Sequence, residues 1–364
     1  MMNTKYLLAL HSLRNMNAVR LKNLMDFYEH DAEKAWHDTA NWHQVEGFSV
    51  NSVGLIAAFM DKVKIADLYE HYINSYAGMM VLTDDNYPAL LKSIYDPPYL
   101  FFYYGALPSP AEITIAMIGT RSATTYGKQV ARVLARDVAA QGIWVVSGMA
   151  RGLDSICHRG ALEAGGKTIA VLGSGLDVIY PPENDQLYRQ IIENGAVISE
   201  WPFGAAPDKG HFPVRNRIIS GLSKGVVVIE AGTRSGTLLT VDRAMEQNRD
   251  VFTVPGPITS AKSKGTNALL SQGAKPVGCA EDIWREYLPE AKAVAFATQE
   301  GEIDNNDDER VLRLLSNEPI HFDQVAGKLE IMPQKLAAMM TMLEIKGLVK
   351  QLPGKYYIKA INRI

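Results

Sequence analysis

The sequence predicts an α/β protein whose central domain is an open parallel β-sheet with helices on both faces. Between Ile115 and Thr237 one pattern occurs five times: a short apolar run, a small polar turn and a helical segment. Near-continuous Val/Ile runs that alternate with helices are typical of parallel strands buried on both sides. Segments with helical periodicity lie before and after this region, so we expect a smaller domain at each end.

Length and composition are those of a globular protein with more than one domain. The chain has 364 residues, of which 47% are hydrophobic and 21% are charged, and its formal net charge is -3. As a prior, this length corresponds to two or three domains with full cores. Because the whole molecule carries no strongly positive field, any contact with nucleic acid has to come from a local basic patch.

Cysteine usage and the N-terminal residues predict a cytoplasmic protein. Cys157 and Cys279 are isolated and lack the spacing of a metal site, which fits a reducing compartment and predicts no bound metal. The first residues lead into a mixed polar segment rather than a signal peptide. No apolar run is long enough to span a bilayer, so we expect no membrane partner.

Residues 1–78 are predicted to form a helical domain. Tyr6, Leu7, Leu10 and Leu13 recur with the period of one helical face. The first turn, residues 14–17, contains no glycine. We therefore favour a helical packing module over a hairpin that contacts a DNA backbone.

An aromatic run over residues 99–104 follows the segment Asp96-Pro97-Pro98. The prolines argue against a helix through this region. The aromatic rings are of a type that stacks on bases, but a strand at a sheet edge is the more common meaning of such a run. We expect an edge strand here.

The central domain is expected to cover residues 79–295 and to supply the parallel strands. Helices are predicted between the strands, for instance over Gly127–Ala140 and Leu153–Ala164. The predicted strands are Ile113–Ile118, Ile143–Val146, Thr168–Leu172, Ala196–Ile198, Val226–Ile229 and Val251–Val254.

The C-terminal residues 309–364 are predicted to form a winged helix-turn-helix. Residues 296–308 are polar and acidic and are expected to be a linker. Three helical patterns and a β-ribbon follow, and this order is typical of a winged helix. These segments are Glu309–Leu315, Phe322–Leu329 and Pro333–Lys346, then Val349–Leu352 and Tyr356–Ile358.

Polar turns follow the strands of the central domain, and in an open parallel sheet such turns meet along one edge. Small residues let backbone N–H groups approach an anion closely, and arginine adds a planar fork that suits phosphate. The sequence therefore predicts an anion-binding edge rather than a single pocket. The turns are Gly119-Thr120-Arg121-Ser122, Ser147-Gly148-Met149-Ala150-Arg151-Gly152, Gly173-Ser174-Gly175, Ser199-Glu200 and Gly232-Thr233-Arg234-Ser235-Gly236-Thr237.

Residues 209–217 form the stretch richest in groups that suit single-stranded nucleic acid. Lys209, Arg215 and Arg217 offer charge for phosphates, Asn216 offers an amide, and Phe212 offers a ring face for a base. In an alternative interpretation, Phe212 packs locally before a helix and Arg217 belongs to an internal salt bridge.

Two carboxylates near these turns are given structural roles. Asp154 is expected to cap or neutralise a helix N-terminus, and with His158 one turn later it is expected to form a surface pair rather than a catalytic one. Glu230 is expected to pair with Arg215 or Arg217. The turn at Gly173 lacks the third glycine of a dinucleotide fingerprint, so an NAD site is not expected.

Taken together, these motifs resemble the DprA/Smf family of DNA-processing proteins. The resemblance covers roughly residues 80–280, in order and without large gaps, which makes it far more specific than any single turn. The segments that carry it are Tyr87-Pro88, Asp96-Pro97-Pro98, Ile118-Gly119-Thr120-Arg121, Ser147-Gly148-Met149-Ala150-Arg151-Gly152-Leu153-Asp154, His158-Arg159-Gly160-Ala161, Gly173-Ser174-Gly175-Leu176-Asp177, Tyr180-Pro181, His211-Phe212-Pro213, Arg215-Asn216-Arg217-Ile218-Ile219-Ser220-Gly221-Leu222, Glu230-Ala231, Ser235-Gly236-Thr237 and Val254-Pro255-Gly256.

The resemblance implies an extended Rossmann-like domain that binds single-stranded DNA, flanked by a SAM-like helical domain and a winged helix. It implies no enzymatic activity and no cofactor, and a role in loading a RecA-type recombinase during natural transformation. Phosphate contact falls on Arg121 and Lys209, and base contact falls on Phe212. It also implies a homodimer formed near residues 265–274, for which we select Asn267, Leu269 and Leu270.

The residues and the resemblance together give one set of expected DNA-binding positions. They are Gly119, Thr120, Arg121, Ser122, Ser147, Gly148, Arg151, Gly152, Gly173, Lys209, Phe212, Arg215, Asn216, Arg217, Gly232, Ser235, Gly236 and Thr237.

Two other functions compete with strand binding. A Rossmann-like nucleotide phosphoribohydrolase also uses a turn ending in Gly-Thr, but the catalytic Glu expected after Gly236-Thr237 is missing, and Leu238-Leu239-Thr240 follows instead. A ligand-sensing transcription regulator would account for the winged helix. Release of free base from nucleotides would indicate the first, and duplex binding tighter than single-strand binding would indicate the second.

Overall fold

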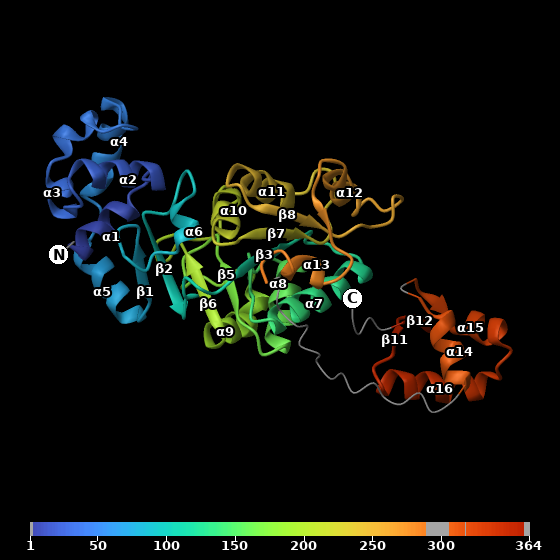
Figure 1. Ribbon diagram of the computed structural model, residues 1–364. Coiled ribbons are helices and arrows are strands. Elements are labelled where there is room, and N and C mark those ends of the chain that lie inside the picture. Colours follow the sequence, from blue (N-terminus) through green and yellow to red (C-terminus); the bar gives the residue numbers. More distant parts are fainter. Residues whose placement is uncertain (1–2, 289–305, 317, 360–364) are drawn as a thin grey trace.

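A computed structural model describes residues 3–288, 306–316 and 318–359 (Figure 1). The first described residues form helices, as predicted. They are α1 (Thr4–Ser12), α2 (Ala18–Phe27), α3 (Ala32–His37), the 3-10 helix η1 (Thr39–Gln44), α4 (Val50–Met60) and α5 (Ile65–Ser75). Side chains at three N-termini accept the first free backbone amides, since Asn17, Asp31 and Ser49 each bond an N–H three residues on.

The helical domain and the central sheet share one hydrophobic core. Leu7, Leu10 and Leu24 are buried in the same cluster as Phe102 and Leu172 of the sheet region. A hydrogen bond between His30 Nδ1 and the Tyr99 hydroxyl, 3.1 Å apart, adds a polar contact between the helical domain and the sheet. The boundary expected between residues 78 and 79 falls inside the first strand, which begins at Gly78.

The central sheet has nine strands in the order β1-β2-β6-β5-β4-β3-β7-β8-β9. The predicted parallel strands are present, and no end differs from its expected bound by more than one residue. The strands are β1 (Gly78–Val81), β2 (Leu100–Gly105), β3 (Thr114–Ile118), β4 (Trp144–Ser147), β5 (Thr168–Val171), β6 (Gly195–Ser199), β7 (Gly225–Val228), β8 (Asp250–Thr253) and β9 (Lys275–Pro276).

The aromatic strand β2 is not at the sheet edge, which corrects the prediction. It pairs antiparallel with β6 on one side and with β1 on the other, with Met80 opposite Phe101. Leu100 and Phe102 are buried against the helical domain, and Phe101 is buried on the opposite face against Tyr87 and Leu91. The apolar rings are therefore core residues.

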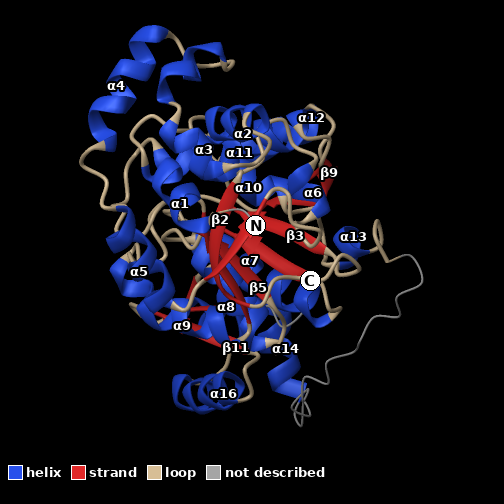
Figure 2. Ribbon diagram, turned by 90° about the vertical axis from the view of Figure 1, so that its left-hand side faces the viewer, coloured by secondary structure: helices blue, strands red, loops and turns tan. Residues whose placement is uncertain are grey.

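Helices cover both faces of the sheet, as Figure 2 shows from the side of the helical domain. On one face, α7 (Thr125–Ala140), α8 (Leu153–Glu163), α9 (Asp185–Glu193) and α13 (Glu281–Trp284) pack on the strands. On the other face lie α6 (Ala89–Lys92), α10 (His211–Gly221), α11 (Thr237–Glu246) and α12 (Lys264–Ser271).

The strand order reverses direction between β3 and β7, which are parallel neighbours in the middle of the sheet. In open α/β sheets the crevice outside the carboxyl ends of the strands at such a switch point is the usual ligand site. The turn after β3 begins at Gly119 and the turn after β7 leads to Thr237, so two of the predicted turns flank this crevice.

The C-terminal described residues form a winged helix with its own core, which contains Val311, Leu336, Met340 and Leu343. The predicted helices and ribbon are present, together with a short additional strand, β10. The elements are α14 (Asn306–Leu314), β10 (Ile320–His321), α15 (Phe322–Leu329), α16 (Pro333–Ile345), β11 (Val349–Leu352) and β12 (Tyr356–Lys359). Of the predicted linker, residues 296–305 lie outside the described residues, and Asn306–Asp308 already belong to α14.

Candidate nucleic-acid interface

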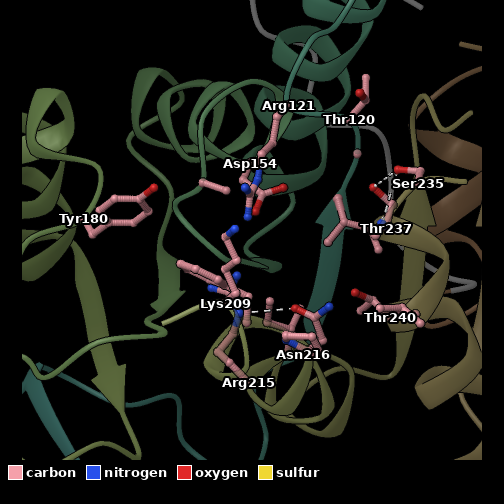
Figure 3. Close-up of a pocket in the computed structure, with 18 residues that line it drawn as sticks. Thr120, Arg121, Asp154, Tyr180, Lys209, Arg215, Asn216, Ser235, Thr237 and Thr240 are labelled. Carbon is pink, nitrogen blue, oxygen red and sulfur yellow. Dashed lines mark hydrogen bonds between the residues drawn. The ribbon is translucent and has the colours of Figure 1, made fainter. Parts of the chain in front are cut away.

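Turns from separate βα units line one cavity of about 590 Å³ at the switch point. Arg121 and Lys209 reach into the same space, with Ser235 and Thr237 on one side and Tyr180 on the other (Figure 3). The lining residues are Ile118, Gly119, Thr120, Arg121, Ala150, Asp154, Tyr180, Lys209, Phe212, Pro213, Arg215, Asn216, Ile219, Ser235, Gly236, Thr237, Leu239 and Thr240.

Glu230 holds the turn after β3 in place. Its backbone oxygen accepts the Thr120 amide at 2.9 Å, and its carboxylate accepts the Thr124 amide at 3.0 Å and the Thr124 hydroxyl at 2.5 Å. The expected pairing of Glu230 with Arg215 or Arg217 is therefore wrong. The carboxylate is buried against Gly127 at the start of α7, and Glu230 does not line the cavity.

Asp154 lies beneath the turns and uses some of their amides. Its side chain is buried, and the backbone N–H groups of Ala150, Gly119 and Gly148 donate to it. Burial raises the pKa of Asp154, while the nearby Arg215 guanidinium and these amides oppose the rise. The amides of Gly119 and Gly148 were expected to face phosphate, and the structure corrects this because they point inward to a carboxylate.

Asp154 and His158 do not form the expected surface pair. His158 is fully buried, and its Nδ1 lies 2.6 Å from the Thr168 hydroxyl on the neighbouring strand. Burial lowers the pKa of His158 to about 3, with Arg215 and Arg159 acting in the same direction. The imidazole is therefore neutral and structural.

Arg215 and Arg217 are buried, so neither serves as the predicted phosphate contact. Arg215 is 4% exposed and donates from Nη1 to the backbone oxygens of Gly148, at 2.8 Å, and Val171. Burial lowers the pKa of Arg215 to about 10. Arg217 is 2% exposed and pairs with Asp96 at 3.0 Å and Glu200 at 2.7 Å, so the alternative interpretation of Arg217 as an internal salt-bridge partner is the one observed.

Three small residues of the predicted site support the turns rather than face the cavity. Ser147 is buried and its hydroxyl donates to the Met117 backbone oxygen at 2.7 Å, so its side chain is not free for DNA. Gly152 has φ of +84° at the start of α8, and a Cβ there would lie 2.5 Å from the Thr120 oxygen. A Cβ on Gly173 would lie 2.8 Å from the ring of Phe212, so glycine allows this ring to approach the strand end.

Two neighbouring aromatic rings, each with an exposed arginine beside it, lie along the cavity and the smaller hollow next to it. Arg121 lies over Phe212 at 5.3 Å, and Arg151 lies over Tyr180 at 5.9 Å. The rings of Tyr180 and Phe212 are 5.7 Å apart and connect the two pairs. We call these four residues the cation–aromatic row.

Lys209 lies two residues before α10, where it is exposed and lines the cavity with Phe212 and Asn216. Tyr180 was missed as a site residue, although it stands in the matching segment Tyr180-Pro181 and its aromatic type was visible. Lys262 was also missed, and its Nζ reaches the Ser122 hydroxyl at 2.5 Å from the loop after β8.

The turn before α11 forms the other wall of the cavity. The Ser235 hydroxyl lies 2.9 Å from the Thr237 hydroxyl, and Gly236 between them faces open space. Gly232 is half-buried near the backbone of Ala261. The hydroxyls and the helix start leave this wall polar and suited to an anion.

The residues selected for a dimer interface lie on or near α12. Asn267 uses its side-chain amide within the protomer, donating to Gly256 O at 2.9 Å and accepting from the Gly256 amide at 3.2 Å. Leu269 is buried in the protomer's own core, so its side chain is not available to a second copy, which corrects its selection. Leu270 is half-buried.

Within the described part of the chain, no group of three or more His, Cys, Asp or Glu side chains is placed to hold a metal ion. Over the same residues, no helix has both the length and the apolar character needed to cross a membrane.

Comparison with known proteins agrees with the fold. The family described as DNA recombination-mediator protein A matches residues 78–288, and the DprA winged helix domain matches residues 296–355. Protein Smf of Synechocystis is 32% identical, with 97% of this chain and 98% of that protein covered. The DNA processing protein DprA of Streptococcus pneumoniae is 45% identical over 57% of this chain and 73% of that protein.

Solved structures show the same likeness. DNA processing protein A from Streptococcus pneumoniae superposes with a TM-score of 0.69 at 36% identity, covering 79% of this chain and 99% of that one. DNA processing protein A from Helicobacter pylori, studied for its single-stranded DNA binding mode, has a TM-score of 0.53 at 30% identity, with 60% and 98% covered. The chain therefore belongs to the DprA/Smf family of DNA-processing recombination mediators and carries the winged-helix domain of that family.

Proposed function

We propose that this protein binds single-stranded DNA and acts as a recombination mediator that protects incoming strands and loads a RecA-type recombinase in natural transformation. Its role is non-enzymatic. The observation that carries the proposal is the convergence of Arg121, Lys209 and Phe212 on one cavity at the switch point of the sheet. Two exposed cations and a ring in reach of one another are the groups that a single strand requires.

The cations and the ring have separate tasks in this proposal. Arg121 offers a planar fork to phosphate oxygens and Lys209 offers a mobile point charge. Phe212 offers a face to an unpaired base, and stacking of this kind tolerates any base. Because phosphate contacts position a strand without reading it, sequence preference should be weak.

A single strand is favoured over a duplex because the half-buried ring of Phe212 at the cavity offers a stacking face to an unpaired base, whereas a base in a duplex is already stacked on its neighbours. The Helicobacter pylori relative, whose single-stranded DNA binding mode has been studied, supports the same choice. Competition between single- and double-stranded oligonucleotides of equal length distinguishes the two. Tighter duplex binding would favour the regulator interpretation.

Homodimerisation and recombinase loading belong to the same proposal and rest on membership of the family. A homodimer would place two copies of the cavity on one strand. Sedimentation over a range of protein concentrations measures the association, and recombinase filament assembly on strands already coated with a binding protein measures loading.

The direct test is strand binding by a variant that lacks both cations. Arg121→Ala with Lys209→Ala should abolish binding, because both charges lie at the cavity, while thermal unfolding stays nearly unchanged since both side chains are exposed. For the unmodified protein, with about 4 to 6 phosphates neutralised, log affinity against log salt should have a slope of roughly -3 to -4.

A matched control removes two arginines elsewhere. Arg132→Ala with Arg285→Ala causes the same loss of charge on exposed helix surfaces away from the cavity, and it should bind normally. Equal loss of binding in both double variants, or a slope near zero, would contradict the proposal.

A further inference from the structure

At one end of the cation–aromatic row, Arg151 forms an ion pair with Glu183. Arg151 donates from Nε to Glu183 Oε1 at 2.5 Å and from Nη2 to Glu183 Oε2 at 3.0 Å. The two side chains are 54% and 52% exposed. The guanidinium hydrogen bonds and charge of Arg151 lower the pKa of Glu183, so the carboxylate is ionised at neutral pH. The fork that suits a phosphate therefore already holds an anion.

Tyr180 lies between this ion pair and the proposed base platform. Its ring lines the main cavity and also a smaller neighbouring hollow bounded by Arg121, Arg151 and Phe212. Tyr180 lies beside Phe212, and its face is next to the Arg151 guanidinium. A ring with an adjacent cation provides what one nucleotide needs, a stacking face and a phosphate contact.

We propose that Arg151 and Tyr180 form a second nucleotide subsite, closed in the free protein by Glu183, whose carboxylate competes with DNA phosphate for Arg151. The inference rests on the proposed strand binding and adds to it a subsite and its control. An exposed ion pair is weak and exchanges readily. Phosphate oxygens fit the same two-pronged fork as a carboxylate, so a strand that extends past Phe212 replaces Glu183 on Arg151.

Removing the Glu183 carboxylate should strengthen the binding of single-stranded DNA. The Arg151 background and the Asp185 control then separate this effect from a general change in net charge. Glu183→Gln should raise affinity for oligothymidylates by about two- to fivefold, the factor that corresponds to losing an exposed competing pair. The gain should be absent with strands too short to extend past Phe212. It should also be absent when Arg151→Ala is already present, because the carboxylate acts only through Arg151.

Asp185→Asn is the matched control. Asp185 lies two residues further on, has a side chain that is 50% exposed and pairs with Arg189 at 3.1 Å, and its change alters net charge by the same amount. Arg189 does not line the main cavity or the smaller hollow. Asp185→Asn should leave affinity unchanged, and an equal gain in both variants would overturn the proposal.

The stacking role of Tyr180 is tested by two substitutions. Tyr180→Phe keeps the ring and should bind normally. Tyr180→Ala should weaken binding of long strands by about 5- to 100-fold, the loss expected for one stacked base. Thermal unfolding shows whether each variant is folded, and normal binding by folded Tyr180→Ala would remove Tyr180 from the subsite.

The results keep the two proposals apart. If the unmodified protein binds no single strand, the proposed function fails, and this inference fails with it. If strands bind and depend on Arg121 and Lys209, but Glu183→Gln binds no better than Asp185→Asn, only the closed subsite is refuted.

Discussion

At the residue scale, Glu112 links the amino ends of three neighbouring strands, at the edge of the sheet away from the cavity. Its carboxylate accepts the Ser109 amide at 2.7 Å, the Trp144 indole N–H at 3.0 Å and the Lys167 ammonium at 3.2 Å. Trp144 begins β4, and Lys167 directly precedes β5. These contacts, led by the Ser109 amide, lower the pKa of Glu112 from 4.5 to about 2.

This pKa shift predicts a pH-dependent contribution to stability. Because the folded-state pKa lies below the unfolded value, the contribution is complete above pH 4.5 and is lost as pH falls toward about 2. Glu112→Gln should therefore lower the urea midpoint at neutral pH, and its difference from the unmodified protein should shrink over that window. A difference that stays constant with pH would exclude this role. Strand binding should not change, since Glu112 lies at the opposite edge.

The sequence predicted which residues carry charge near the turns, but not which of those charges are buried. Arg215 and Arg217 stand in the same stretch as Lys209 and were assigned the same task. Their partners are distant in sequence, with Gly148 67 positions from Arg215 and Asp96 121 positions from Arg217. Local composition shows a cation, whereas burial depends on contacts that only the folded chain forms.

At the scale of elements, the start of α8 is set by close contact between two turns. Gly152 has a positive φ, and the Thr120 and Arg121 backbone oxygens lie where a side chain would begin. The Leu153 amide donates to the Thr120 oxygen at 3.3 Å. The turn that carries Arg121 is thus held against the helix that follows Arg151, and the two arginines of the row are positioned by one contact.

Gly152→Ala should disturb stability and strand binding together. A side chain at a residue with this positive φ costs about 1–3 kcal/mol of folding free energy, and contact of the new Cβ with the Thr120 and Arg121 backbone oxygens adds to that cost. Chemical unfolding measures the first effect and oligonucleotide titration the second. Gly236→Ala is the control, because Gly236 has φ of -60° and open space around it, and its stability should be unchanged. Equal stability of the two variants would contradict the argument.

Strand bounds were predictable because each parallel strand is a short run of Val and Ile closed by a polar turn. β7, for example, was expected over Val226–Ile229 and lies at Gly225–Val228. The position of β2 within the sheet was not predictable, because the residues of β2 do not reveal that β1 pairs with its outer side. The short strands β9 and β10 were missed because two residues give no periodicity.

At the scale of the whole molecule, every residue of the cation–aromatic row comes from the central domain. The winged helix has a hydrophobic core of its own, made of residues from its helices and its β-ribbon. Of the described residues, none from this domain lines the cavity. Strand binding and the function of the winged helix are therefore expected to be separable.

Ending the chain after residue 288 should leave affinity for single strands and its salt dependence unchanged. The described cavity residues all precede this point, and so do the residues that hold the turns. Oligonucleotide titration of the shortened chain beside the full chain measures the effect. A large loss of affinity in a shortened chain with normal thermal unfolding would place part of the strand-binding surface in the winged helix.

The shared core of the helical domain and the sheet has a consequence for how the protein can be divided. β1 lies against β2 at the sheet margin, and the helices before it cover Phe102. A protein cut just before residue 80 would lose half of β1 and present an uncovered row of backbone amides and aromatic side chains to water. An exposed edge strand of this kind pairs with other chains, so the fragment should aggregate. By covering β2, the helical domain and β1 keep the central sheet from such pairing.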